Sequence, residues 1–236
     1  STSFDIDILK RSKDEASNRA IWDDLVSRIV GAGSVVGNLP KDKPLGKFAD
    51  EWQAVFDKTL NSNDLKTVDV GPSLSAVWAA KDEDEIKAMK YASRMSSAIM
   101  SGYFENEMSS ILDEGRKVTH EQLSERIEGK LDDDKMWKKV KGLEGADPSL
   151  ADWCYTPIVQ SGGEYDLKTS AVSTSKRLQG ADGNGGVVIA SMGIKYRNYC
   201  SNIGRTYLID PHSSQQKMYA FLHDLQTELV DKHLRA

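Results

Sequence analysis

Residues 187–210 read VVIASMGIKYRNYCSNIGRTYLID. The stretch contains two runs rich in β-branched and aromatic residues, which favour β-strands. The first run covers residues 187–196 and the second covers residues 199–210. The pattern is strand-like from Ala151 onward, and a final helix is expected from about Ser214. This segment therefore decides the fold class, because it adds strands to a chain whose preceding part is predicted to be helical.

Two helices are predicted directly ahead of the strand-rich segment. The acidic run at residues 82–85 suits the positive end of a helix dipole, and Gly115 is a natural stop for the helix that follows. A capping-box pattern begins at Thr119 and precedes a second helix. We expect one shared core from apolar side chains spaced three or four residues apart: Leu123, Ile127 and Leu131 facing Ile86, Met89, Met95 and Ile99.

The first third of the chain alternates between strand and helix. Strands are predicted at residues 4–8, 35–37 and 68–70, the second of them buried, and helices at residues 21–29 and 48–56. This order favours a layered α/β unit with a partly parallel sheet. The unit is short, so we interpret it as the end of a lobe that began before residue 1.

The composition excludes several classes of protein. The chain has 236 residues, with 31 Lys and Arg against 36 Asp and Glu, so the formal charge is 31 − 36 = −5. It lacks the basic excess of a domain that coats nucleic acid, and no apolar run approaches the ~20 residues of a membrane span. Hydrophobic residues make up 39% of the chain, which is enough for a core and argues against global disorder.

Residues that often carry chemistry are sparse. The four histidines lack metal-ligand spacing, so we interpret them as surface residues of helices and turns. Cys154 and Cys200 lie in apolar, strand-like contexts and are expected to be buried structural thiols. No nucleophile elbow or phosphate loop is present, and the glycines at 183–186 precede a strand, so they are interpreted as turn formers.

The strand pair at residues 187–210 resembles the metal-binding strands of the pita-bread metallopeptidases, the superfamily of aminopeptidase P, methionine aminopeptidase and creatinase. In that family two Asp residues, eleven positions apart, bridge two divalent metals. The surrounding frame is present here, including Gly193 and the Arg205-Thr206 pair, but the two Asp positions hold Ser191 and Asn202. Both side chains are neutral and cannot offset two adjacent dications as carboxylates do.

A second landmark supports the same resemblance. Residues 157–162 read PIVQSG and resemble the strand and turn that lead to a substrate-contacting His in the peptidases. That position is Lys168 or Thr169 here, depending on a one-residue gap. The remaining family ligands, one His and two Glu, would lie beyond residue 236.

With this upstream motif, the run YCSNIGRT at residues 199–206 is similar to the N-terminal aminopeptidase-like domain of the large subunit of the FACT histone chaperone. The resemblance implies an α/β (α+β) fold with two lobes. Residues 1–76 would be the C-terminal part of a creatinase-like lobe. Residues 77–236 would be the first part of a pita-bread lobe with a curved antiparallel sheet.

The same resemblance implies a non-catalytic, histone-binding domain in the nucleus, with no catalytic residue, metal or cofactor. Its partners would be core histones, the small FACT subunit through other regions, and replication or transcription factors, with no membrane and no sequence-specific nucleic-acid binding. Two alternatives stay open: an active metal-dependent aminopeptidase, and a scaffold lobe that docks replication or transcription factors.

We also predict that the old substrate cleft survives as a peptide-sized groove formed by Tyr199, Asn202, Arg205 and Lys168. The basis is that Tyr199 and Arg205 keep the family register although the chemistry no longer requires it. The competing interpretation is that these residues only pack and hydrogen-bond within the sheet.

Overall fold

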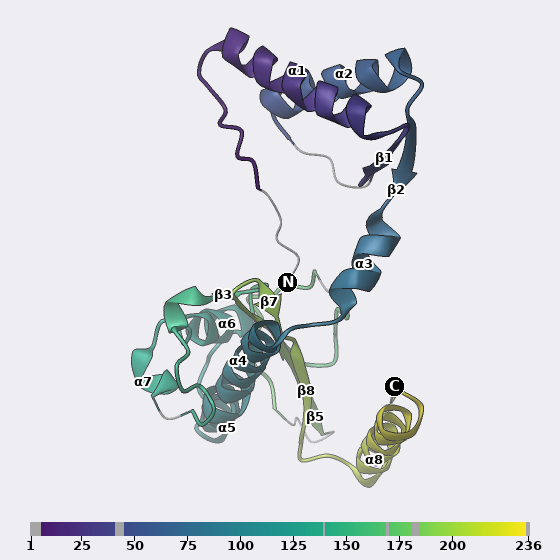
Figure 1. Cartoon of the computed structure of the whole chain (residues 1–236). Helices are drawn as coiled ribbons and strands as arrows, with labels where there is room; N and C mark the ends of the chain where they lie inside the picture. Colours follow the sequence, from purple (N-terminus) through teal and green to yellow (C-terminus); the bar gives the residue numbers. More distant parts are fainter. Residues whose placement is uncertain (1–5, 41–44, 139, 169, 181–184, 235–236) are drawn as a thin grey trace. The chain divides into compact units, whose positions relative to one another are not determined.

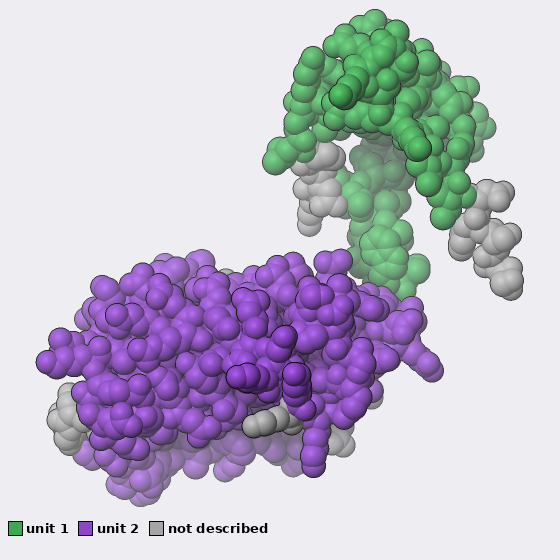
Figure 2. All heavy atoms as spheres, turned by 90° about the vertical axis from the view of Figure 1, so that its left-hand side faces the viewer, with its two compact units in different colours: residues 1–81 green, residues 82–236 purple. Residues whose placement is uncertain are grey.

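The computed structural model describes residues 6–40, 45–138, 140–168, 170–180 and 185–234. The chain divides into two compact units, Ser1–Lys81 and Asp82–Ala236, which Figure 2 shows in separate colours. The boundary expected at residues 76 and 77 falls inside a helix of the first unit, Gly71–Ala79. Each unit is described by itself below.

The first unit alternates helix and strand, as its sequence predicts, and ends in a helix over residues 71–79 that was not predicted. It contains α1 (Glu15–Ala32), β1 (Val35–Asn38), α2 (Lys47–Ser62), β2 (Lys66–Asp69) and α3 (Gly71–Ala79). β1 and β2 pair in parallel, with Val35 opposite Lys66. Asp14 caps α1 by accepting a 2.8 Å hydrogen bond from the amide of Ser17.

Two expectations for the first unit are wrong. Residues 6–8 form no strand, and residues 4 and 5 lie outside the described residues. β1 is not buried, because the register places Val35 and Val68 on one open face of the two-stranded sheet, where their exposed fractions are 58% and 50%.

The helices of the second unit begin and end where the local signals indicate. They are α4 (Glu83–Ile99), a π-helical turn (Met100–Phe104), α5 (Glu105–Asp113), α6 (His120–Glu128) and the short α7 (Asp134–Trp137). Complete capping boxes start α4 at Asp82 and α6 at Thr119. Gly115, just past α5, has a φ of 63°, which a residue without a Cβ adopts without strain.

One continuous core fills the second unit. Leu123, Ile127, Met95 and Ile99 are each 0% exposed, and Leu131 is also buried, as predicted. The prediction is wrong for Ile86 and Met89, which are exposed. Both lie off the row that α4 buries, formed by Ala88, Ala92, Met95 and Ile99 at steps of four, three and four residues.

The strands of the second unit form two antiparallel three-stranded sheets. One has the order β3 (Ala151–Trp153), β6 (Ile194–Tyr196) and β7 (Tyr199–Cys200). The other has the order β4 (Ile158–Ser161), β5 (Gly186–Met192) and β8 (Ile203–Ile209), with β5 and β8 lying side by side in Figure 1. The helix α8 (Ser213–Glu228) follows, close to its expected start, with largely exposed side chains.

Each of the two expected long strands is split in two. β5 and β6 are separated at Gly193, and β7 and β8 are separated at Ser201 and Asn202. A Cβ at Gly193 would lie 2.4 Å from the carbonyl oxygen of Ser201. The backbone segments at residues 193 and 201 therefore approach each other at a distance that only glycine permits. Within the described residues, no helix is long and apolar enough to cross a membrane.

Candidate functional site

The two positions at which the family resemblance implies metal-binding Asp residues, here called the former metal positions, lie close together and share one hydrogen-bonding partner. Ser191 is half-buried near the end of β5, and Asn202 is exposed in the gap between β7 and β8. The hydroxyl of Tyr155 donates to Oδ1 of Asn202 at 2.6 Å and lies 2.8 Å from Oγ of Ser191. Because the phenol has a single proton, the Ser191 hydroxyl is the donor in the second bond.

Tyr155 is placed by the end of β3. The amide of Cys154 donates to the carbonyl of Gly193 at 2.9 Å, which fixes the chain one residue before the tyrosine. An ideal Cβ at Gly193 would lie 3.2 Å from the Tyr155 ring, so the glycine also leaves room for that ring. Burial raises the pKa of Tyr155, while the hydrogen bond from Ser191 lowers it, so the hydroxyl is neutral and protonated at physiological pH.

The donor set at this position does not fit a paired divalent metal. The oxygens that meet belong to a phenol, an alcohol and a carboxamide, and all three are neutral. Hard dications in proteins are held by carboxylate-rich oxygen ligands. Over the described ranges of the chain, no three His, Cys, Asp or Glu side chains are grouped as a metal site.

The strand register separates the predicted groove residues onto two faces. Arg205 pairs with Ala190, whose side chain is fully buried on the helix-covered face of β5. Gly204 pairs with Ser191, so Ser191 points to the opposite face. Tyr199 pairs with the buried Tyr196 and donates its hydroxyl to a carboxylate oxygen of Glu85 at the start of α4.

Asn202 therefore lies with Ser191 and Tyr155, while Tyr199 and Arg205 lie toward the helices. The guanidinium of Arg205 donates to the carbonyl of Gly204 at 2.8 Å. The structure does not bring Asn202 and Arg205 to one surface. The peptide groove remains a prediction, and only its Asn202 side adjoins the former metal positions.

Lys168 lies on a loop that folds back over β4. Gln160 fastens this loop with two hydrogen bonds to the backbone of Asp166, at 2.7 and 2.8 Å. The Tyr165 hydroxyl donates to the carbonyl of Val187 on β5 at 2.9 Å. Lys168 itself is exposed, and Thr169, the alternative position, lies outside the described residues.

His120 is a polar residue that the surface interpretation missed. It is 2% exposed at the start of α6, where Nε2 lies 2.7 Å from Oγ of Ser161 and Nδ1 lies 3.2 Å from Oγ1 of Thr174. Burial lowers its pKa, and the positive charge of Lys176 lowers it further. The signal was present, because His120 precedes the buried Leu123 and Ile127 by three and seven residues on the same helix face.

Both cysteines are exposed, so the prediction of buried structural thiols is wrong. Cys154 directly follows β3, and Cys200 ends β7. Neither strand is long enough to carry the residue into the core, since β3 has three residues and β7 has two.

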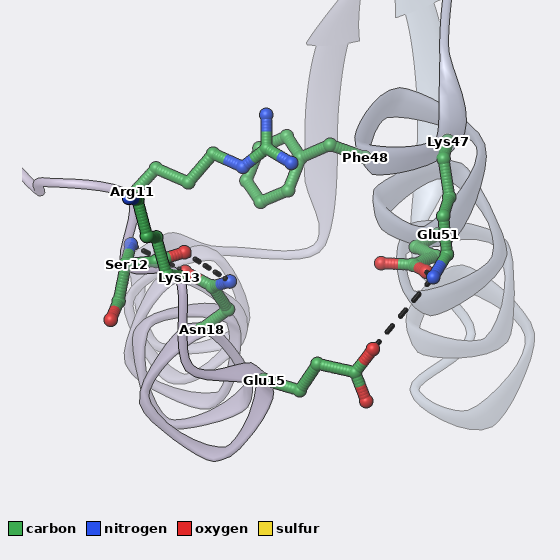
Figure 3. Close-up of a pocket in the computed structure, with 8 residues that line it drawn as sticks. All are labelled: Arg11, Ser12, Lys13, Glu15, Asn18, Lys47, Phe48 and Glu51. Carbon is green, nitrogen blue, oxygen red and sulfur yellow. Dashed lines mark hydrogen bonds and ion pairs between the residues drawn. The ribbon is translucent and has the colours of Figure 1, made fainter.

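The first unit contains a separate polar cavity of about 350 Å³ between the starts of α1 and α2, shown in Figure 3. Arg11 stacks 4.5 Å above the ring of Phe48. The ammonium of Lys47 lies 3.7 Å from Glu15 and 3.5 Å from Glu51. None of the predicted site residues lines this cavity.

Comparison with protein-family models divides the chain at nearly the same place as the structure. The model described as "Metallopeptidase family M24" matches residues 87–236, more than half of the chain. The model described as "FACT complex subunit SPT16 N-terminal lobe domain" matches residues 1–73.

The curated relatives that match this chain are named as FACT complex subunit SPT16. The chain is 83% identical over 236 residues to FACT complex subunit SPT16 of Mycosarcoma maydis, covering 100% of this chain and 23% of that protein. It is 43% identical to the corresponding Emericella nidulans protein, covering 92% of this chain and 21% of that protein. The chain therefore spans about a quarter of the length of these relatives.

Solved structures agree on the fold. The N-terminal domain of SPT16 from Eremothecium gossypii matches with a TM-score of 0.81 and 41% identity, over 95% of this chain and 51% of that chain. An X-Pro aminopeptidase from Thermotoga maritima matches with a TM-score of 0.59 and 19% identity, over 89% of this chain and 51% of that chain, which shows the fold alone.

These findings confirm the resemblance inferred from residues 157–162 and 187–210, and they confirm the mixed α/β fold with antiparallel sheets. The two family matches also fall on the two compact units. The chain belongs to metallopeptidase family M24, in the form found in the N-terminal region of FACT complex subunit SPT16.

Proposed function

We propose that this chain is a non-catalytic, histone-binding part of a histone chaperone that acts on nucleosomes in transcription and replication. Its setting would be the nucleus, in association with chromatin. Core histones would be its direct partners, and other regions of the longer protein would meet the small FACT subunit. The family membership and the identity to SPT16 proteins support this assignment.

The observation that carries the non-catalytic part is the hydrogen-bonded set of Tyr155, Ser191 and Asn202. In an M24 peptidase of the pita-bread type, the positions of Ser191 and Asn202 would hold metal-binding carboxylates. Here the side-chain oxygens of Ser191 and Asn202 both hydrogen-bond to the hydroxyl of Tyr155. A hydrolytic reaction that depends on metal-activated water has no charged ligand pair at this place.

The histone-binding part rests on charge and on the family. The chain has a formal charge of −5, and histones are strongly basic, so the long-range field favours their encounter. The mechanism would be competition, in which groups of this chain occupy histone surfaces that DNA otherwise covers. Such binding weakens as salt rises, since exposed charges are screened.

A binding assay across a salt series tests this assignment. Immobilised chain is incubated with free histone tails and, separately, with folded histone complexes. We expect retention of at least one of the two, with less retained at higher salt. No retention of either at low salt would contradict histone binding by this chain.

A matched pair of variants locates the binding face. Asn202→Ala changes the surface beside Ser191, and Arg205→Ala changes the opposite face of the same sheet. If an extended tail adds to the Asn202 side, only the first variant loses tail binding. If both variants melt like the parent and bind histones unchanged, the groove is only structural and binding lies on the outer surface of the units.

The two alternatives predict different results in the same experiments. An active aminopeptidase would cleave proline-containing peptides in the presence of divalent metal. A scaffold lobe would retain replication or transcription factors while failing to retain histones. The neutral donor set at Tyr155 disfavours the first alternative.

A further inference from the structure

The two cysteines of the chain come together at the surface of the second unit. β3 and β7 flank β6 in one sheet, with Cys154 just after β3 and Cys200 at the end of β7. Sγ of Cys154 lies 3.9 Å from the carbonyl oxygen of Ser201. Both residues are exposed to solvent.

The sheet register explains why the thiols share a face. Lys195 on β6 pairs with Asp152 on one side and with Cys200 on the other. Cys154 lies two residues after Asp152 and therefore points the same way. The 3.3 Å ion pair between Lys195 and Asp152 shows that these side chains do share one face.

Gly193 lets the Cys154 side chain reach across the end of β6. The Cys154 amide donates to the carbonyl of Gly193, so the two residues are opposite each other. A Cβ at Gly193 would lie 3.5 Å from that of Cys154 and 2.4 Å from the Ser201 carbonyl oxygen. The glycine thus occupies the space between the two cysteine-bearing segments and has no side chain to separate them.

We propose that Cys154 and Cys200 form a redox-active thiol pair, which closes to an intrachain disulfide by exchange with a low-molecular-weight disulfide such as oxidised glutathione. Two thiols are oxidised to one disulfide, and one molecule of oxidised glutathione is reduced to two molecules of glutathione. No other oxidant is needed.

The exchange runs in two steps. The thiolate of one cysteine attacks a glutathione sulfur, expels one glutathione and forms a mixed disulfide. The other cysteine then loses its proton, attacks the cysteine sulfur of the mixed disulfide, and expels the second glutathione.

The new bond would adjoin the former metal positions. Cys154 precedes Tyr155, and Cys200 lies two residues before Asn202, so the disulfide would join the two segments that the Tyr155–Asn202 hydrogen bond already connects. A covalent link that closes the chain between residues 154 and 200 restricts the unfolded state, so the oxidised protein should melt at a higher temperature than the reduced protein.

The test is peptide mapping after exchange. The folded protein is incubated with oxidised glutathione at pH 8, remaining thiols are alkylated, and the digest is analysed without reduction. We expect a peptide pair linked through Cys154 and Cys200. The exchange should accelerate from pH 7 to pH 8, because the thiolate is the attacking group.

Two single variants test the pairing. Cys154→Ser should stop at a stable mixed disulfide on Cys200, and Cys200→Ser should stop at one on Cys154, because the second thiol is missing in each. The proposal is overturned if both parent thiols remain alkylatable, if each carries its own glutathione, or if the linked peptides come from two separate molecules.

Discussion

The two faces of β5 differ in what they preserve. Val188, Ala190 and Met192 are each 0% exposed against the helices, whereas Ile189 and Ser191, between them, are only half-buried. The first three side chains belong to the core that the strands share with the helices. On the other face, Ser191 stands at a position where the family resemblance implies a metal-binding Asp. We infer that packing on the buried face is sufficient to hold these strands in register whatever group stands on the other face.

The tyrosines of the frame support this explanation. Tyr196 is 2% exposed, its ring meets that of Tyr91 edge-on at 5.3 Å, and its hydroxyl accepts a 3.0 Å hydrogen bond from the amide of Asp147. Tyr199 hydrogen-bonds to Glu85 at the start of α4. Both residues contact the helical layer, so their place in the sequence pattern does not require a bound peptide.

The largest expected effect is on the core that the buried face of β5 shares with the helices. Ile99→Ala removes a fully buried side chain from the core of the second unit, which should lower the free energy of unfolding by about 2–5 kcal/mol. Met89→Ala on the same helix is the control, because Met89 is exposed, and it should cost less than about 0.5 kcal/mol. Urea melts of both variants measure the difference, and equal losses would contradict the assigned core face.

The crossing between the two sheets is the next most sensitive place. Gly193→Ala forces a Cβ against the Ser201 carbonyl oxygen, and we expect a loss of about 1–3 kcal/mol. Gly204→Ala is the matched control on β8, since its new Cβ would have ordinary contact at 3.9 Å. Thermal melts compare the two variants. A Gly193 variant as stable as the Gly204 variant would show that the close crossing is absent.

The third effect depends on pH and concerns His120. Its pKa is lowered in the folded state, so the unfolded state binds a proton first as the pH falls. The contribution of His120 to stability should therefore be constant above about pH 7 and decline below the unfolded pKa of about 6.5, with a slope of at most about 1.4 kcal/mol per pH unit.

Variants isolate the His120 contribution. His120→Gln should flatten this decline in melts between pH 7 and 5, although it also lowers stability at every pH. His223→Gln is the control for replacing a histidine, because that side chain is 66% exposed, and it should change stability at pH 7 by less than about 0.5 kcal/mol. A decline that survives in His120→Gln would assign the pH dependence to other groups.

The smallest effect is expected at the former metal positions. Tyr155→Phe removes the hydroxyl shared by Ser191 and Asn202, and should cost about 1 kcal/mol, because both partners are partly open to water. Denaturant melts of Tyr155→Phe and of the parent measure this cost. A loss as large as that of Ile99→Ala would mean that the hydrogen-bonded set is a principal support of the fold.

Local signals predicted two helix starts of the second unit. The acidic run at residues 82–85 and the capping-box pattern at Thr119 act within about four residues, so the sequence alone indicated where α4 and α6 begin. The helices of the first unit are longer than predicted, because they run from Glu15 to Ala32 and from Lys47 to Ser62. The separation of Arg205 from Ser191 depends on the register between β5 and β8, which is set by the break at Gly193 and by the two-residue turn at Arg197 and Asn198, both with positive φ.

Contacts between residues far apart in the sequence could not be predicted from local spacing. Tyr155 lies 36 residues from Ser191 and 47 from Asn202, so no spacing rule connects them. His120 is a different case. The spacing from Leu123 and Ile127 places it on the buried face of α6. It was nevertheless interpreted as a surface residue, because it stands at the start of the helix.

The central claim is that the face of β5 bearing Ser191 no longer supports metal-dependent hydrolysis, whereas the opposite face still supports the fold. Calorimetric titration of the full-length protein with manganese, followed by an assay with proline-containing peptides, tests it most directly. We predict no tight two-site binding and no hydrolysis, and no turnover after the double change Ser191→Asp and Asn202→Asp if further ligands are also missing. Two-site binding accompanied by peptide hydrolysis in the unmodified protein would contradict the claim.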